Sequence, residues 1–178
     1  DGSEVDRDTL IKRMYTHIDT VVSRYKGRIK YWDVVNEAID TKHVDGEQIA
    51  FLRESPWLRI IGPEYIEMAF RAAHKADPSA LLLYNDFSMF EPAKIQFTAE
   101  LFEGLMAKGM PIHGVGFQGH WHLKYPKISE VEAAIERMAA LGLKVSISEL
   151  EVGILPLADD HQGAEIDRSI ALAERLNP

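Results

Sequence analysis

Residues 32–38 read WDVVNEA, and this stretch decides how the rest of the chain is interpreted. Two branched aliphatic residues lead directly into Asn36 and Glu37, with no turn residue between them. Such a pair can simply cap a following helix and face water, because helix starts favour this chemistry. Alternatively, Glu37 lies at the carboxyl end of a buried strand, which is where α/β proteins assemble their sites. The second interpretation gains weight if other strands of the chain end in the same way.

Composition and charge exclude several classes of protein. The chain has 178 residues, of which 46% are hydrophobic, enough for one domain with its own core. The net charge is −8 and there is no run of five like charges, so nucleic acid is not an expected partner. The absence of cysteine excludes disulfides and thiolate metal sites but leaves the redox compartment open. No apolar run approaches the ~20 residues of a membrane span, and the N-terminus DGSEVDRDTL lacks a signal-peptide pattern, so we expect a soluble protein.

Helix and strand patterns alternate four times along the chain. Each predicted helix shows apolar residues at helical spacing, ends at a Gly or Asp-Pro signal, and is followed by a short apolar strand. The helices are predicted at residues 6–25, 62–77, 91–109 and 129–142, and the strands at 31–36, 81–85, 113–118 and 144–148. Asp6 or Asp8 is placed to cap the first helix, and Ser129 opens a capping box at the fourth.

The alternation indicates an α/β fold. Parallel strands need connections of a dozen residues or more, which the helices supply as right-handed crossovers. No Gly-rich phosphate loop follows any strand, so a nucleotide-binding doubly wound fold lacks its main feature. A (β/α)8 TIM barrel fits better, but it needs eight units in about 250 residues, and only four are present. The connection 40–62, which carries Arg53 and Trp57, contains no predicted element and is long enough to be functional.

All four predicted strands deliver polar groups at their carboxyl ends. These groups are Asn36 and Glu37, Asn85 and Asp86, Gln118 and His120, and Glu149. Because the carboxyl ends of parallel strands meet at one edge, they predict a single site there. Glu37 and Glu149 lie on strands three units apart and can face each other across a barrel mouth. A pair of carboxylates of this kind hydrolyses glycosides, one as acid and the other as nucleophile or base.

The neighbouring polar residues leave two kinds of chemistry open. Gln118 and His120 are spaced so that both point to the same side of their strand, where they could hold one carboxylate ionised. Asn36 could donate to a sugar hydroxyl. The rival chemistry is metal-assisted hydrolysis, with ligands from His113, His120, His122, Glu149 and Asp86. The first strand has no His-x-His pair and no bridging lysine is evident, so neither a metal ion nor another cofactor is expected.

Five ordered motifs resemble the glycoside hydrolase family 10 xylanases: WDVVNEAI, RESPW with IIGPEYI, LLLYND, GVGFQGH and SISELEV. The resemblance covers nearly all of the chain. It implies that Glu37 is the acid/base, that Glu149 is the nucleophile, and that Asn36 binds near the 2-hydroxyl of the reacting sugar. It also implies that Tyr84 lines the substrate cleft.

The resemblance further implies that Gln118 and His120 hydrogen-bond the nucleophile or the substrate. There are departures from the family pattern. Ser148 and Glu151 flank the nucleophile where threonine and aspartate are more frequent. Phe87-Ser88 follow the LLLYND motif where tyrosine and asparagine are common. The chain matches strands four to seven of the barrel, and strands one to three and eight are absent from it.

We therefore expect residues 1–178 to be a partial catalytic domain of a retaining endo-1,4-β-xylanase, acting on xylan or xylo-oligosaccharides. By family resemblance, a secreted or cell-surface location is expected. The remaining barrel strands would come from another chain or from other residues of the polypeptide. The alternatives are a non-catalytic carbohydrate-binding or structural half-barrel and, less favoured, a relative acting on cellulose or mannan.

Overall fold

The computed structural model describes residues 4–154. In chain order its elements are α1 (Arg7–Arg24), β1 (Tyr31–Asn36), β2 (Ile39–Val44), β3 (Glu47–Leu52), α2 (Pro56–Ile60), α3 (Tyr65–Ala76), β4 (Leu81–Asp86), α4 (Pro92–Ala107), β5 (Gly114–His122), α5 (Ile128–Ala139) and β6 (Lys144–Gly153). The expected domain also includes residues 1–3 and 155–178, which lie outside the described part. Within residues 4–154 no helix is both long and apolar enough to cross a membrane.

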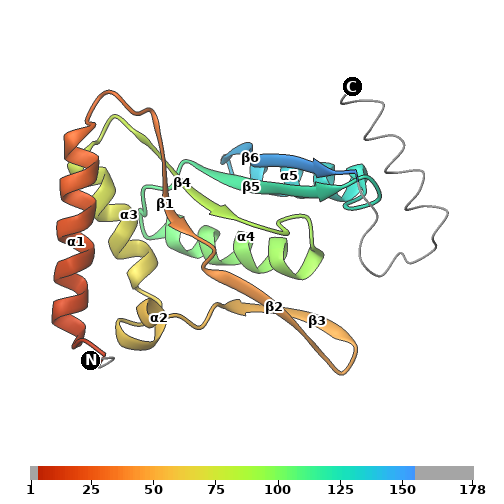
Figure 1. The fold of residues 1–178 in the computed structure, drawn as a ribbon, viewed down its shortest axis with the longest axis horizontal. Coiled ribbons are helices and arrows are strands. Elements are labelled where there is room, and N and C mark those ends of the chain that lie inside the picture. The colour runs from red at the N-terminus through yellow and green to blue at the C-terminus, as the bar shows by residue number, and fades with distance from the viewer. Residues whose placement is uncertain (1–3, 155–178) are drawn as a thin grey trace.

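The main sheet has the order β1-β4-β5-β6, and every pair in it is parallel. Successive strands are joined through α3, α4 and α5, which confirms the predicted α/β alternation (Figure 1). α1 precedes the first strand and packs beside α3. The parallel order brings the carboxyl ends of all four strands to one edge of the sheet, as the polar strand ends require.

The helix starts are set by local hydrogen bonds. Asp6, rather than Asp8, caps α1, because its side chain accepts the backbone N–H of Thr9 at 2.9 Å. At α5 the predicted capping box is wrong by two residues. The helix begins at Ile128, and the N–H of Lys127 donates to the Glu130 carboxylate at 3.2 Å. Glu130 accepts from the N-cap backbone, as was predicted for Glu132. Each glutamate lies three residues after a possible N-cap, Lys127 for Glu130 and Ser129 for Glu132.

The long connection after β1 is not the irregular loop that the sequence analysis predicted. β2 and β3 form an antiparallel hairpin that packs on α4, and α2 follows it. Asp45 and Gly46 make its turn, with φ values of 52° and 87°. Two positive φ values in a two-residue loop match the right-handed twist of hairpin strands, and Asp-Gly favours this turn. The Asp-Gly signal between alternating residues was present in the sequence and was missed.

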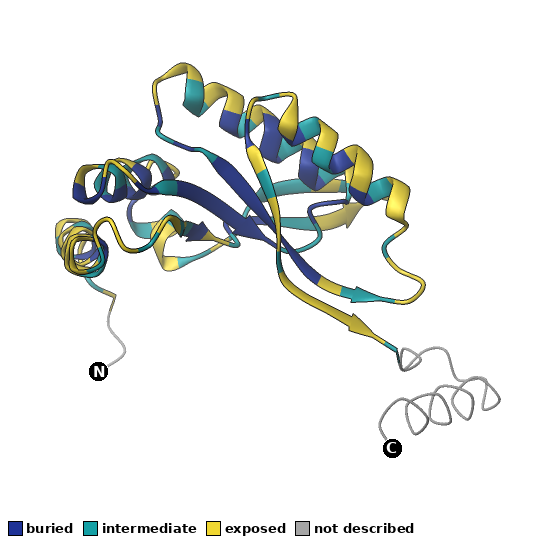
Figure 2. Ribbon diagram, turned by 90° about the horizontal axis from the view of Figure 1, so that it is seen from above, coloured by how far each residue is buried: buried dark blue, intermediate teal, exposed yellow. Residues whose placement is uncertain are grey.

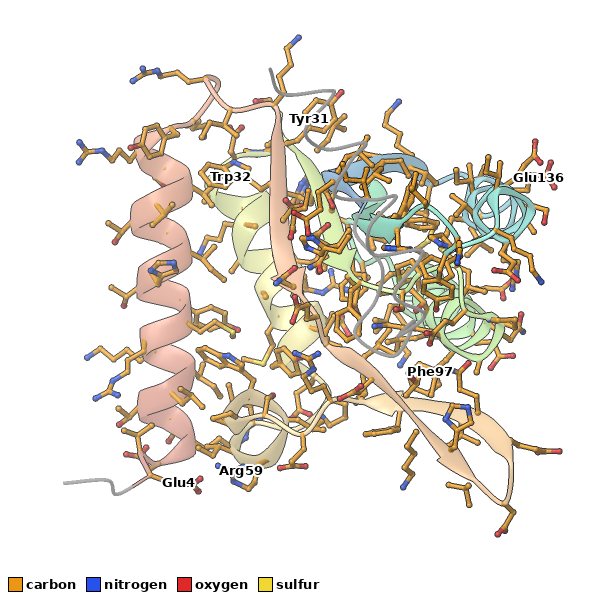
Figure 3. All side chains as sticks on the ribbon, turned by 45° about the vertical axis from the view of Figure 1, so that its right-hand side comes forward. Glu4, Tyr31, Trp32, Arg59, Phe97 and Glu136 are labelled. Atoms are coloured by element: carbon orange, nitrogen blue, oxygen red, sulfur yellow. The ribbon has the colours of Figure 1, made fainter. Side chains whose placement is uncertain are left out.

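Figure 3 shows Glu4, just before α1, close to Arg59 of α2, and the two side chains form an ion pair. Arg7 in the first turn of α1 forms a second ion pair with Glu64, at 2.9 Å. These contacts hold α2 and the start of α3 against the amino end of α1. Since the pairs are largely exposed, they contribute little to stability.

Burial divides the sheet into an inner and an outer part (Figure 2). Every residue of β4 after Leu81 is buried, and so are the first six residues of β5. Most residues of β1 and β6 are exposed or half-buried. The largest fully buried side chains of the core include Phe70, Phe102 and Phe117. Within residues 4–154, each inner strand has a hydrogen-bonded neighbour on both sides, whereas each outer strand has one on a single side.

Candidate active site

The carboxyl ends of the parallel strands bring polar side chains together, as predicted. Asn36 at the end of β1 is in register with Asn85 on β4, and Gln118 on β5 is in register with Ser148 on β6. Neighbouring strands are only about 4.8 Å apart, so side chains at matching positions can touch. These two pairs place four polar side chains at this end of the sheet.

Glu37 directly follows β1 and has a left-handed backbone, with φ 54°. For a residue other than glycine this conformation costs about 1–3 kcal/mol and persists only where the surroundings fix it. The Glu37 N–H donates to the carbonyl of Asn85 at 2.8 Å. Its carboxylate accepts from Gln118 Nε2 at Oε1 (3.0 Å) and from Arg53 Nη1 at Oε2 (2.8 Å). These two donors, Gln118 first, hold the pKa of Glu37 below its usual value despite partial burial.

Arg53 reaches Glu37 because the β2–β3 hairpin folds back on itself. The Arg53 N–H donates to the carbonyl of Ala38 at 2.8 Å, which anchors the end of the hairpin beside the end of β1. Its guanidinium also lies 5.2 Å from the ring centroid of Phe87 and 3.8 Å from the Asp40 carboxylate. The sequence analysis assigned no role to Arg53. The Asp-Gly turn of the hairpin was the sequence signal for this contact, because the hairpin returns the chain to the end of β1.

Glu149 also has a left-handed backbone, with φ 54°, but it lies within a strand rather than at its end. β6 continues to Gly153, beyond the predicted end, and its register against β5 shifts between Gln118 and His120. Glu149 sits in the resulting bulge, a feature that redirects side chains next to active sites. Its carboxylate accepts from Asn85 Nδ2 at Oε1 (2.8 Å) and lies 3.0 Å from His120 Nε2 at Oε2.

His120 lies between two carboxylates. Its Nδ1 is 2.9 Å from Glu151 Oε1, on the other side from Glu149. The hydrogen bond with Glu151, followed by that with Glu149, raises the pKa of His120 above its usual value. Glu151 was not predicted to take part in the site. Its side chain is 72% exposed, but it orients the histidine that contacts Glu149.

Three amide side chains connect the two glutamates. Asn36 Oδ1 accepts from Asn85 Nδ2 (3.0 Å) and from Gln118 Nε2 (3.2 Å), while the same two donors reach Glu149 and Glu37. Asn85 in turn accepts from the Ser148 hydroxyl. Gly116 makes room for this arrangement, because a Cβ there would lie 2.3 Å from Asn85 Oδ1. The sequence analysis noted Asn85 as a polar strand end but gave it no role.

Most of the predicted site residues come together, but Tyr84 does not line a cleft. Its side chain is fully buried, and its hydroxyl accepts from the Ala38 N–H (3.1 Å) and donates to Asp86. Residues on β4 alternate between the two faces, and Tyr84 lies on the face away from Asn85, against Phe102 of α4. The expectation that Tyr84 contacts substrate is therefore wrong.

The proposed ligands of the rival metal site make other contacts. His113 directly precedes β5, and its Nδ1 accepts the Leu82 N–H at 3.0 Å. Asp86 is fully buried in an ion pair with Lys94, at 2.8 Å. Among residues 4–154, no group of three or more histidine, aspartate or glutamate side chains is arranged to hold a metal ion.

A groove of about 670 Å³ opens beside Glu37. It is lined by α1, by the end of β1 and by the hairpin–α2 connection, and its lining includes Glu37, Arg53 and Trp57. This space runs along the outer edge of β1, where strand three of a complete barrel would pair. Trp57, 37% exposed, presents an aromatic surface in that groove.

Comparison with known proteins identifies relatives of this arrangement. The profile of Glycosyl hydrolase family 10 matches residues 1–173. An endo-1,4-beta-xylanase from Geobacillus stearothermophilus is 47% identical over 161 residues, which are 90% of this chain and 47% of that protein. The chain spans about half the length of the curated relatives that it matches, 47% and 46% of the first two.

Solved structures agree. Xylanase XynB from Paenibacillus barcinonensis superimposes with a TM-score of 0.80 at 41% identity, over 86% of this chain and 45% of that one. An intracellular xylanase from Thermoanaerobacterium saccharolyticum, solved as a mutant in complex with xylotriose, gives 0.75 at 38% identity, over 88% and 48%. The parallel sheet described above matches part of the TIM barrel of these enzymes. The chain belongs to glycosyl hydrolase family 10.

Proposed function

We propose that the chain is part of the catalytic domain of a retaining endo-1,4-β-xylanase, with Glu149 as nucleophile and Glu37 as acid/base. In this proposal β1, β4, β5 and β6 are strands four to seven of the barrel. One observation carries it. Two glutamates with the same unusual backbone conformation are held at one sheet edge by a single chain of amide hydrogen bonds. A sheet edge with only a structural role would not require a left-handed backbone at Glu37 or at Glu149.

The proposed reaction has two displacements. In the first, Glu149 attacks the anomeric carbon while protonated Glu37 gives its proton to the leaving glycosidic oxygen, forming a covalent glycosyl-enzyme. In the second, ionised Glu37 takes a proton from water, and that water releases the sugar from Glu149. Asn85 and His120 orient the nucleophile, and Gln118 and Arg53 favour the ionised acid/base that the second step uses.

The proposed substrate is xylan or a xylo-oligosaccharide. It is supported by the family and by the relative solved with xylotriose. Asn36 uses its carbonyl oxygen to accept from two neighbouring amides, which leaves its amide group to donate to the 2-hydroxyl of the reacting sugar.

A second candidate function is favoured by the extent of the match. The chain covers about half of its relatives, and within residues 4–154 the sheet has open edges at β1 and β6. A half-barrel that binds sugar without cleaving it, or that acts only when the other strands are supplied, would have these properties.

The assignment of Glu37 is tested with Glu37→Ala and substrates of different leaving groups. Unactivated xylo-oligosaccharides need a proton at the leaving oxygen, so their kcat/KM should fall by about 10²–10⁴-fold. Xylosides with a good leaving group need no proton in the first step and should lose far less. Equal losses on both substrates would show that Glu37 is not the acid. Retention at the anomeric carbon, followed by NMR on an active barrel that contains this chain, tests the double displacement.

The need for the remaining strands is tested on the isolated 178-residue chain. Two open edges in a parallel sheet are normally paired, covered or prone to association, so we expect self-association and little xylanase activity. Sedimentation and a xylan assay are run on the same preparation. A stable monomer with full activity would mean that the site requires less of the barrel than proposed.

A further inference from the structure

Tyr84, Asp86 and Lys94 form a fully buried polar cluster that has no part in the proposed reaction. Lys94 Nζ lies 2.8 Å from Asp86 Oδ1, and the Tyr84 hydroxyl donates to the other carboxylate oxygen. The cluster joins β4 to the first turn of α4. It lies on the face of β4 away from Asn85, so its members do not reach the proposed substrate.

Stability alone does not account for this cluster. Removing two charges from water costs several kcal/mol per ion, and replacing a buried ion pair by apolar residues is often neutral or stabilising. The Tyr84 ring packs edge-on against Phe102, with ring centroids 5.1 Å apart, a contact that a phenylalanine would make as well. The hydroxyl and the charges therefore need another explanation.

The cluster reaches Glu37 through its backbone. The Tyr84 hydroxyl accepts the N–H of Ala38, the residue that follows Glu37. The Glu37 N–H is held by Asn85 and the Ala38 carbonyl by Arg53, both through backbone groups. The strained φ of Glu37 is thus fixed on both sides, and the Tyr84 hydroxyl supplies the one side-chain contact among these three.

The cluster also reaches Glu37 through Arg53. Asp86 Oδ1 accepts the Phe87 N–H at 2.8 Å, and Lys94 Nζ lies 3.6 Å from the centroid of the Phe87 ring. The same ring lies against the guanidinium of Arg53, which pairs with Glu37. These contacts fix the ring of Phe87, and the ring in turn supports Arg53, the partner of the Glu37 carboxylate.

We propose that Tyr84, Asp86 and Lys94 are positioning residues that fix the direction of the Glu37 carboxylate for proton donation to the leaving group. This inference rests on the proposed role of Glu37. Misplacing a reacting group by about 1 Å can cost on the order of 10²-fold, so one lost hydroxyl has room to produce a measurable effect.

The test is Tyr84→Phe in the chain, or reconstituted barrel, that shows xylanase activity. We expect kcat/KM on unactivated xylo-oligosaccharides to fall by about 10-fold, and kcat/KM on a dinitrophenyl xyloside, which needs no proton, to change by less than about twofold. The matched control is Asp77→Asn. Asp77 is also fully buried and accepts the Gly27 N–H at 2.8 Å, but it lies in the loop leading into β4, at the amino end of the strand. The control should lower Tm without separating the two substrates.

Hydrogen exchange of the Ala38 amide gives a readout that does not depend on activity. Exchange should be faster in Tyr84→Phe, because the N–H loses its acceptor, and unchanged in Asp77→Asn. A complete barrel that contains this chain but does not hydrolyse xylo-oligosaccharides would overturn the proposed function. An active enzyme in which Tyr84→Phe affects both substrates equally, or leaves the Ala38 amide protected, would overturn this inference alone.

Should Tyr84→Phe fail to fold, the double variant Asp86→Asn with Lys94→Met decides the matter. It removes both charges together and keeps the side-chain volumes close to the original ones. The same separation of the two substrates, about 10-fold, is expected from it. Equal losses, or no loss on either substrate, would overturn the inference.

Discussion

The outer strands of the sheet carry the carboxylates, whereas the inner strands carry the buried amides, Asn85 and Gln118, that donate to them. Glu37 follows β1 and Glu149 lies in β6, each in a left-handed backbone conformation, on strands that are mostly exposed. Asn85 and Gln118 lie on β4 and β5 and are buried. The difference shows a division of labour. The core fixes the hydrogen-bond donors, and the donors fix the carboxylates.

This division has an energetic basis. A fully buried amide must have its hydrogen bonds made, and Asn85 and Gln118 make theirs with Asn36 and the two carboxylates. The carboxylates keep contact with solvent, Glu149 with 45% of its side chain exposed and Glu37 with 31%. Substitutions on outer strands should therefore affect chemistry more than folding, and substitutions around the inner strands the reverse.

The largest expected effect is on activity, from Glu149→Gln. The amide cannot act as a nucleophile, so turnover of xylan should fall by at least about 10⁴-fold. Because the side chain is half exposed, thermal unfolding should change little. The matched control on the same strand is Glu151→Gln. It should lose far less activity, because Glu151 contacts His120 but is not the proposed nucleophile. Xylan hydrolysis above about 1% in Glu149→Gln would remove Glu149 from the proposed role.

The next effect is on stability, and it compares Phe102→Ala with Leu150→Ala. Phe102 is fully buried beneath the inner strands, and its loss should reduce the free energy of unfolding by about 3–5 kcal/mol. Leu150 is 62% exposed on β6, so its loss should cost less than about 1 kcal/mol in the isolated chain. Both values come from urea unfolding. A large cost at Leu150 would mean that β6 acquires a neighbour in solution, which would break the distinction between inner and outer strands.

The inner part of the molecule was the more predictable from sequence. Apolar runs such as 81–84, bounded by Asp-Pro and by Asn-Asp, report burial directly, because a residue packed on both sides has few alternatives. The parallel order and the gathering of polar strand ends followed from the alternation alone. The main error inside this part was Tyr84. The direction of its side chain follows from strand alternation, which places Tyr84 on the opposite face of β4 from Asn85.

The outer part depended on contacts that local patterns do not encode. The sequence analysis missed that Arg53 returns to Glu37, because this requires recognising the Asp45-Gly46 turn. It also ended β6 at Ser148, because a bulge is set by register against β5 rather than by propensity. The conformation of Glu149 in that bulge has no signature among neighbouring residues. Long-range contacts and backbone strain were therefore the features that could not be predicted from local sequence patterns.

The smallest expected effect is a shift in pH dependence, from Arg53→Met. Methionine keeps an unbranched apolar side chain but removes the guanidinium that lies over Phe87 and beside Glu37. Proton donation requires protonated Glu37, so kcat/KM on unactivated xylo-oligosaccharides declines as the pH rises through the pKa of Glu37. Gln118 and Arg53 together depress that pKa. Removing Arg53 should raise it, and the alkaline limb of the profile should move to higher pH.

The same substitution should change how stability depends on pH. A carboxyl group whose pKa is depressed in the folded state stabilises the fold above its unfolded pKa, and this contribution is lost as the pH falls through the folded pKa. In Arg53→Met the acid-side loss of stability should therefore be smaller.

For the alkaline limb of the activity profile, Arg7→Met is the matched control. It removes an arginine from a carboxylate at a similar distance, Glu64 at 2.9 Å, but in the first turn of α1. If both variants left the alkaline limb unchanged, or if Arg53→Met moved it to lower pH, the hairpin arginine would not be tuning the acid/base. In that case the carboxylates would be controlled by the amides of the inner strands alone.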